Sequence, residues 1–166
     1  MSLSEIIIRR YQAGDSDGIV NVIVPIQVAE FGIAITAEQQ PDLRDIEAFY
    51  QRGSGDFWVA EHAGDIVGCI ALKDIGDGQC ALRKMFVAAA YRGRDYGIAA
   101  RLLSALLEHA RRSGVQDIFL GTTAQFLAAH RFYEKHGFQE VAVETLPSSF
   151  PIMKVDSKFY HWSFYA

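Results

Sequence analysis

The segment Leu82–Leu103, LRKMFVAAAYRGRDYGIAARLL, links a predicted strand to a predicted helix through a loop that carries glycine and arginine. The strand is expected to end near Val87, and apolar residues at helical spacing begin near Ile98. The first main-chain N–H groups of a helix have no partner within the helix, and the helix dipole adds partial positive charge there. Glycine lets a ligand approach the backbone closely. The segment therefore predicts a site for a phosphate or pyrophosphate.

Two other phosphate-binding patterns are missing from this loop. No Lys-Ser or Lys-Thr follows the glycines, as a P-loop requires, and the Gly-x-Gly-x-x-Gly spacing of dinucleotide folds is absent. A nucleotide cofactor with a pyrophosphate therefore stays open. The plain alternative is a polar turn before an ordinary helix.

The chain before this segment predicts an antiparallel meander preceded by helices. Alternating and β-branched residues, with turn signals at Gly64-Asp65 and Asp77-Gly78, predict strands at Ile6–Tyr11, Phe57–His62, Ile66–Asp74 and Gln79–Val87. Helices are expected from Asp15 or Asp17 through Val24, where Pro25 must kink or interrupt the helix, and over Asp42–Arg52.

The chain after it predicts alternating helices and strands. Helices are expected from Ile98 to Gly114 and over Phe126–His136, and strands over Asp117–Gly121, Phe138–Thr145 and Lys158–Tyr165. We therefore expect a single domain over residues 1–166, of the α+β class, with helices on both faces of one sheet.

Charge, apolar segments and cysteines limit the partners, the location and the metal sites that we expect for this chain. The 166 residues include 16 basic and 20 acidic side chains, a net charge of −4, which gives no general attraction for nucleic acid or anionic lipid. Arg9 and Arg10 interrupt the apolar run Ile6–Ile8, so no signal peptide is expected, and no segment reaches the roughly 20 apolar residues of a membrane span. Cys69 and Cys80 form no Cys-x-x-Cys pair, so we expect no metal site. We expect a cytoplasmic protein with neither a nucleic-acid nor a membrane partner.

Two motifs resemble those of the GNAT superfamily of N-acetyltransferases. Arg94-Asp95-Tyr96-Gly97-Ile98-Ala99 matches the family's Gln/Arg-x-x-Gly-x-Gly/Ala signature. Downstream, Gln125–Phe138, QFLAAHRFYEKHGF, resembles the family's Asn-x-x-Ala and Tyr-Glu-Lys-x-Gly-Phe segment. The resemblance covers most of the chain. It implies a three-layer α/β/α fold with a central, mostly antiparallel mixed twisted sheet of about seven strands, and acetyl-CoA as co-substrate without a metal.

The resemblance also implies which residues bind acetyl-CoA. The strand end should pair with the pantetheine, the loop and helix start should hold the pyrophosphate, and Gln125 takes the place of the family's Asn. The implied contacts are Met85, Phe86, Val87, Arg92, Gly93, Arg94, Asp95, Tyr96, Gly97, Ile98, Ala99, Gln125 and Tyr133. Many members have Arg-Gly-x-Gly-x-Gly directly after the Tyr. Here Tyr91-Arg92-Gly93 comes first and the signature begins at Arg94, two residues later than in those members, so the loop is expected to be longer than usual.

The implied chemistry needs a proton for the departing thiolate and a neutral amine. Tyr133 stands where the family's general acid lies, with ordinary packing of a helix tyrosine on the sheet as the alternative. His130 is a candidate base, with a surface or coenzyme-contacting histidine as the alternative. Glu61, Asp74 and Glu30 are further candidates, and a water chain would also serve.

The resemblance implies an acceptor with a primary amine, on a small molecule or a peptide. Two alternatives to an acetyltransferase stay open. The chain could be a non-catalytic acyl-CoA sensor on the same fold, or a protein that binds another nucleotide. The loop Leu146–Pro151 is expected near the mouth of the acceptor site. The aromatic strand Phe159–Tyr165 predicts either a buried strand or the interface of a homodimer.

Overall fold

One mixed sheet contains every strand that the structure describes. The computed structural model describes residues 5–30, 32–33, 35–93, 96–123, 127–153 and 156–164. In these residues the sheet has seven strands in the order β1-β2-β3-β4-β5-β7-β6. Neighbouring strands are antiparallel except for β4 and β5, which are parallel. The strands are β1 (Ile6–Arg10), β2 (Asp56–His62), β3 (Asp65–Gly76), β4 (Gln79–Val87), β5 (Asp117–Thr122), β6 (Gln139–Val141) and β7 (Lys158–Ser163).

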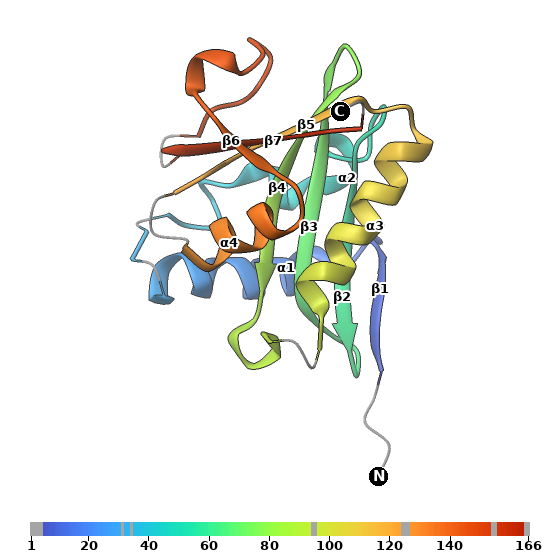
Figure 1. Ribbon diagram of the computed structural model, residues 1–166. Helices are drawn as coiled ribbons and strands as arrows, with labels where there is room; N and C mark the ends of the chain where they lie inside the picture. Colours follow the sequence, from blue (N-terminus) through green and yellow to red (C-terminus); the bar gives the residue numbers. More distant parts are fainter. Residues whose placement is uncertain are drawn as a thin grey trace.

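Helices cover both faces of this sheet, which confirms the predicted architecture. Figure 1 shows α3 and α4 on one face and α1 on the other. The helical segments are α1 (Ser16–Pro25), η1 (Ile26–Glu30), η2 (Pro41–Arg44), α2 (Ile46–Phe49), η3 (Ala89–Tyr91), α3 (Ile98–Arg112), α4 (Leu127–Lys135) and η4 (Val143–Thr145).

The two hairpin turns have positive φ at both central residues, as type I′ turns require. Asp77 (φ 57°) and Gly78 (φ 71°) form the turn predicted between β3 and β4. The turn before β3 is Ala63 (φ 52°) and Gly64 (φ 86°), one residue earlier than predicted. Asp65 instead begins β3, where it pairs with His62.

Two predicted elements are wrong in extent. The helix expected over Asp42–Arg52 is divided into the 3₁₀ turn η2 and the short α2, because Asp45 between them has a non-helical backbone (φ −143°, ψ 55°). The strand expected over Phe138–Thr145 pairs with β7 only over Gln139–Val141 and then turns into η4. At Pro25 the predicted interruption takes the form of a π-helical segment, η1, since proline has no N–H for the α-helical ladder.

Each face of the sheet has its own buried core. The face under α3 and α4 packs around Leu102, Leu106 and Tyr133. The face under α1 and α2 packs around Ile23 and Tyr50, with Phe86 of β4 against it. A third cluster joins Ala81, Phe119, Phe150 and Phe159. Because both faces are covered, β2 and β3 carry runs of consecutive buried residues.

The parallel pairing of β4 and β5 is short. It joins Gln79 to Asp117, Cys80 to Ile118 and Ala81 to Phe119. Beyond Ala81, β4 continues to Val87 without pairing to β5, so the two strands separate within the sheet.

The two cysteines are buried, free thiols. Burial raises the pKa of Cys69 to about 12 and that of Cys80 to about 11, so both stay protonated at neutral pH. In the part of the chain that the structure describes, no cluster of His, Cys, Asp or Glu could hold a metal ion. No helix in that part has the length and apolar character needed to cross a membrane.

The α3 core gives a direct test of the packing. Leu106 is fully buried, whereas Leu127 at the start of α4 is 62% exposed. We expect Leu106→Ala to lower the free energy of unfolding by about 2–5 kcal/mol through lost contacts and a cavity. The matched change Leu127→Ala should alter it by less than about 0.5 kcal/mol. Urea unfolding of both variants measures the difference, and equal losses would contradict the packing of α3 on the sheet.

Candidate functional site

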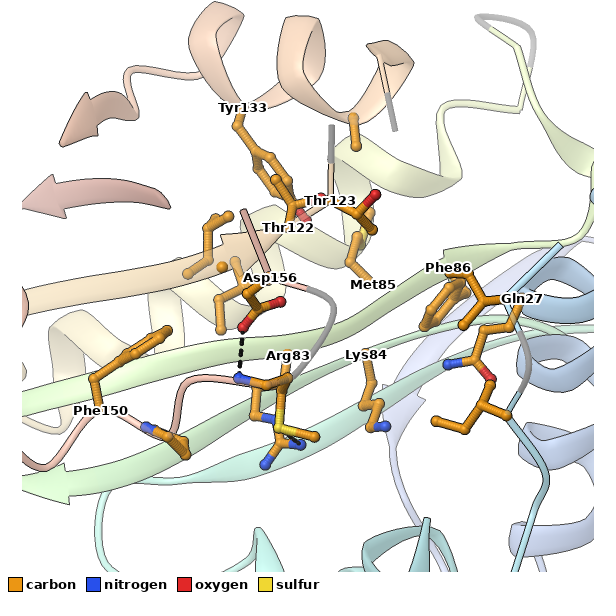
Figure 2. Close-up of a pocket in the computed structure, with 18 residues that line it drawn as sticks. Gln27, Arg83, Lys84, Met85, Phe86, Thr122, Thr123, Tyr133, Phe150 and Asp156 are labelled. Atoms are coloured by element: carbon orange, nitrogen blue, oxygen red, sulfur yellow. Dashed lines mark hydrogen bonds between the residues drawn. The ribbon is translucent and has the colours of Figure 1, made fainter. Parts of the chain in front are cut away.

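A pocket opens where β4 and β5 separate. Tyr133 in its wall belongs to the core under α3 and α4, and Phe86 packs on the core under α1 and α2, so the pocket passes through the sheet from one face to the other. Figure 2 shows Tyr133 pointing from α4 into this space, with Thr122 and Thr123 of the β5 end beside it. The lining residues are Gln27, Ile33, Ile35, Leu82, Arg83, Lys84, Met85, Phe86, Leu120, Gly121, Thr122, Thr123, Ala129, Tyr133, Phe150, Pro151, Met153 and Asp156.

A β-bulge shapes the β4 wall of the pocket. Cys69 of β3 pairs with Phe86 and Ala71 pairs with Arg83, so β4 holds one extra residue between these pairs. Lys84 lies in this stretch with φ at +56°. A regular strand would send neighbouring side chains to opposite faces. Here Arg83 and Lys84 both extend toward the α2 side of the sheet, as Figure 2 shows, because the bulge re-aims one of them.

After the bulge, the backbone of β4 turns one edge toward the gap. The Ala88 N–H donates to the Val67 carbonyl at 2.8 Å, so the adjacent pair Gly68–Val87 is of the non-hydrogen-bonded kind. The N–H and C=O of Val87 therefore point away from β3. The Val87 carbonyl accepts a hydrogen bond from Nε of Arg92 at 2.8 Å. The Val87 N–H faces the side from which β5 has separated.

Tyr133 presents a protonated hydroxyl to the pocket. Its ring packs on Phe138 and Tyr160, with centroids 5.5 and 6.0 Å away. The side chain is 5% exposed, and its hydroxyl makes no hydrogen bond to any residue that the structure describes. Burial raises the pKa of Tyr133 above its ordinary value of 10, so the phenol keeps its proton at neutral pH.

The N-terminus of α3 is built to accept an anion. Gly97 at the N-cap has a left-handed backbone (φ 59°, ψ 26°) and gives no side-chain cap, and the first turn carries no acidic residue. The Gly97 N–H donates a hydrogen bond to the carbonyl of Gly93. Gly93 also has a positive φ, of 117°. Ile98 is buried in the α3 core, Ala99 is half-buried, and Tyr96 is 41% exposed with its ring on Tyr91. Of the predicted phosphate contacts, Arg94 and Asp95 lie outside the described residues.

Arg92 is held by two partners near the loop. Its guanidinium makes a bidentate pair with Glu30, at 2.6 and 2.9 Å, besides its bond to the Val87 carbonyl. This arrangement joins the end of η1 to the loop before α3. Contact between Arg92 and a phosphate stays a prediction.

The candidate bases from the sequence do not line the pocket. His130 is 6% exposed, and its Nε2 donates to the Thr123 carbonyl at 2.9 Å. Glu61 pairs with Arg9, Asp74 accepts the Ser54 N–H, and Glu30 pairs with Arg92. The base role of His130 gains no support from this position and stays a prediction. Gln125, the predicted substitute for the family's Asn, lies outside the described residues.

Charged residues that the sequence analysis did not single out lie in the pocket wall. Lys84 is 9% exposed and reaches Gln40 at 2.7 Å and Asp42 at 3.7 Å, and burial lowers its pKa. Asp156 accepts the Met153 N–H at 2.9 Å. Burial raises the pKa of Asp156, while that hydrogen bond and the positive charges of Arg83 and Lys84 oppose the rise. The adjacent charges Arg83-Lys84 in an otherwise apolar strand were a usable sequence signal, whereas Asp156 had none.

Loop Leu146–Pro151, predicted near the acceptor, contributes Phe150 and Pro151 to the pocket wall. In the aromatic strand, Phe159 and Tyr160 are buried within the chain, and Trp162 and Phe164 are half-buried. The first two side chains therefore serve the core, and a homodimer stays a prediction.

Comparison with known proteins places this geometry in a family. The sequence profile of the acetyltransferase (GNAT) family matches residues 22–138. The N-acetylaspartate synthetase of Xenopus tropicalis is 42% identical over 104 residues, which are 61% of this chain and 38% of that protein. The chain thus spans well under half the length of this curated relative.

Solved structures match nearly the whole chain. A GNAT-family acetyltransferase from Staphylococcus aureus Mu50 superposes with a TM-score of 0.89 at 36% identity, over 95% of this chain and 98% of that one. The PaiA N-acetyltransferase of Thermoplasma acidophilum, solved with coenzyme A, shares the fold at 18% identity, with a TM-score of 0.71 over 99% of this chain and 100% of that one. By its sequence profile and by its similarity to the Staphylococcus protein, the chain belongs to the acetyltransferase (GNAT) family.

Proposed function

We propose that this chain is an N-acetyltransferase that moves an acetyl group from acetyl-CoA to a primary amine of a small molecule or peptide, by direct attack within a ternary complex. One observation carries the proposal. The pocket passes through the sheet at the separation of β4 and β5, with a protonated tyrosine in its wall. Two substrates can enter such a pocket from opposite faces and meet inside the sheet.

The residues present fit a coenzyme A thioester. Its pantetheine amides would bond to the edge of β4 that β5 leaves unpaired, beside Met85 and Phe86. Its pyrophosphate would lie at the uncapped N-terminus of α3, where Gly97 allows close approach. Support also comes from the Thermoplasma structure of the same fold, which holds coenzyme A.

The chain's own groups would then serve the transfer in three ways. Acetyl-CoA supplies the acetyl group as an activated thioester. Holding the two reactants together in the pocket contributes as much as roughly 7–11 kcal/mol to lowering the barrier. The Val87 N–H, which faces the gap, donates to the thioester oxygen as negative charge develops there. The Tyr133 hydroxyl gives its proton to the departing sulfur.

Binding of the coenzyme is the first test of this function. Thermal unfolding is followed with coenzyme A, acetyl-CoA, ATP and NAD, each at increasing concentration. Both coenzyme A species should stabilise the fold, by about 2.7 kcal/mol at a hundredfold excess over Kd, and the other nucleotides should not. Thiol release with an amine panel follows. A chain stabilised by ATP or NAD but not by coenzyme A would not be an acetyltransferase of this kind.

Gly97 tests the pyrophosphate site. Gly97→Ala and Gly97→Glu both place a Cβ at a φ of 59°, which costs roughly 1–2 kcal/mol of stability in each. Only Gly97→Glu adds a carboxylate where the pyrophosphate is proposed to lie. We expect calorimetry to show a far greater loss of coenzyme A affinity in Gly97→Glu than in Gly97→Ala, at similar melting temperatures. Equal affinities in the two variants would place the pyrophosphate elsewhere.

Tyr133→Phe tests the general acid. Removing the hydroxyl should lower kcat by about 100-fold or more and leave the affinity for coenzyme A nearly unchanged. Tyr11→Phe is the matched control, since Tyr11 packs beside Phe57 in the opposite core and does not line the pocket. Steady-state thiol release at saturating acetyl-CoA measures both variants. A Tyr133→Phe enzyme with the rate of Tyr11→Phe would remove the acid role.

A further inference from the structure

Arg83 is a cation in the pocket wall without an anionic partner. No carboxylate of the described residues lies within 4.0 Å of its guanidinium. The guanidinium lies 3.5 Å from the Met153 sulfur and over the rings of Phe49 and Tyr50, whose centroids are 5.5 and 5.9 Å away. These groups hold the guanidinium in place but do not neutralise it.

The neighbouring cation is already satisfied. The Lys84 ammonium is 9% exposed and lies 3.7 Å from the Asp42 carboxylate and 2.7 Å from the Gln40 side-chain oxygen. Asp42 is fixed in turn by the Tyr50 hydroxyl. Lys84 is therefore part of the wall, and Arg83 is left as the group able to take an anion from the pocket. A guanidinium binds a carboxylate through two parallel hydrogen bonds.

Asp156 supplies the opposite charge in the same pocket. It lies before β7, and Figure 2 shows its carboxylate directed into the space between β4 and β5. A Cβ on Gly121 of β5 would come within 2.5 Å of the Asp156 Oδ2, so the absence of a side chain there makes room for this carboxylate. The Met153 N–H holds the same oxygen, and Arg83 and Lys84 are the charged groups that act on it.

We propose that the acceptor is an amine that also bears a carboxylate, such as an amino acid, and that Arg83 binds its carboxylate while Asp156 takes a proton from its ammonium group. This inference rests on the proposed acetyl transfer. An anion and a cation on separate walls of one pocket match the two charged ends of such a molecule. An amine without an acidic group would leave Arg83 unpaired in the filled site, which costs binding energy.

The proton and atom balance follows from these roles. The ammonium gives one proton to Asp156, and the neutral nitrogen then attacks the thioester carbonyl carbon. The C–N bond forms, the C–S bond breaks, and the thiolate takes the Tyr133 proton. The nitrogen's second proton leaves to solvent, solvent reprotonates Tyr133, and Asp156 releases to solvent the proton that it took, which restores its carboxylate. One ammonium and one thioester thus give one amide, one thiol and one released proton.

Acceptor pairs that differ only in the carboxylate test the proposal. Glycine, alanine, aspartate, glutamate and phenylalanine are each compared with the corresponding α-carboxamide by thiol release at saturating acetyl-CoA. More of the amide is a neutral amine at a given pH, so reactivity alone favours the amide. We expect kcat/KM to favour at least one acid over its amide by tenfold or more.

Arg83→Gln should remove this preference, mainly by raising KM for the acid at least tenfold, without changing KM for acetyl-CoA. Arg83→Lys should restore part of it. Lys73→Gln is the matched control, since Lys73 lies over the same Phe49 ring, 4.0 Å from its centroid, but does not line the pocket. It should keep the preference of the wild type.

Asp156→Asn separates a base from a structural role. Asparagine keeps an oxygen for the Met153 N–H but cannot take a proton. We expect kcat to fall at least tenfold near neutral pH and to recover as pH approaches the acceptor amine's own pKa. Because burial raises the pKa of Asp156, the wild-type rate should decline on the acid side at a higher pH than an ordinary carboxyl would give. A loss that is the same at every pH would overturn the base role.

The outcomes separate this inference from the proposed function. Turnover that favours amides, or a preference for acids that survives Arg83→Gln, overturns the inference and leaves acetyl transfer standing. If no pair releases thiol, calorimetry compares N-acetylated acids with N-acetylated amides on the coenzyme A-bound protein. Tighter binding of the acid, lost in Arg83→Gln, supports the inference, and equal binding overturns it. Failure to bind coenzyme A at all defeats the proposed function itself.

Discussion

The separation of β4 from β5 is the constraint on which the site depends. Inside a sheet, main-chain N–H and C=O groups are normally paired with a neighbouring strand, because burying them unpaired is costly. Here the parallel pairing ends at Ala81 and Phe119, and the backbone of β4 beyond that point faces a gap. The fold can keep such a gap because cores on both faces and the antiparallel pairing of β3 with β4 hold each strand from its other sides. An extended ligand with amides is the natural partner for the exposed edge.

The bulge at Lys84 also decides which side chains of β4 lie on each face of the sheet. By adding one residue to β4, it sends Arg83 and Lys84 to one face and leaves Met85 in the core under α3. The strand therefore presents an apolar side toward Tyr133 and a charged side toward the face of α2. In the proposed reaction, donor and acceptor would approach from opposite faces of the sheet and meet in the gap.

How much of this could be predicted from the sequence depended on whether the signal was local. The amphipathic pattern of α3 and the Asp77-Gly78 turn each depend on neighbouring residues, and both elements were predicted from them. The phosphate site at the glycine loop before Ile98 stays a prediction. The prediction of a strand over Phe138–Thr145 was wrong beyond Val141, because the apolar pattern of this segment does not show where pairing with β7 ends. Asp156 was missed because the residues that place it in the pocket, Gly121 and Arg83, are distant in sequence. The base role of His130 stays a prediction, and a hydrogen bond to the Thr123 carbonyl, which the sequence could not show, occupies its Nε2.

A crystal structure of the chain with coenzyme A would show whether the gap between β4 and β5 holds the acetyl donor. We expect the pantetheine in the gap between β4 and β5, with the sulfur beside the Tyr133 hydroxyl and the pyrophosphate at the N-terminus of α3. Coenzyme A bound along another edge of the sheet, or in the gap with its sulfur remote from Tyr133, would contradict this expectation.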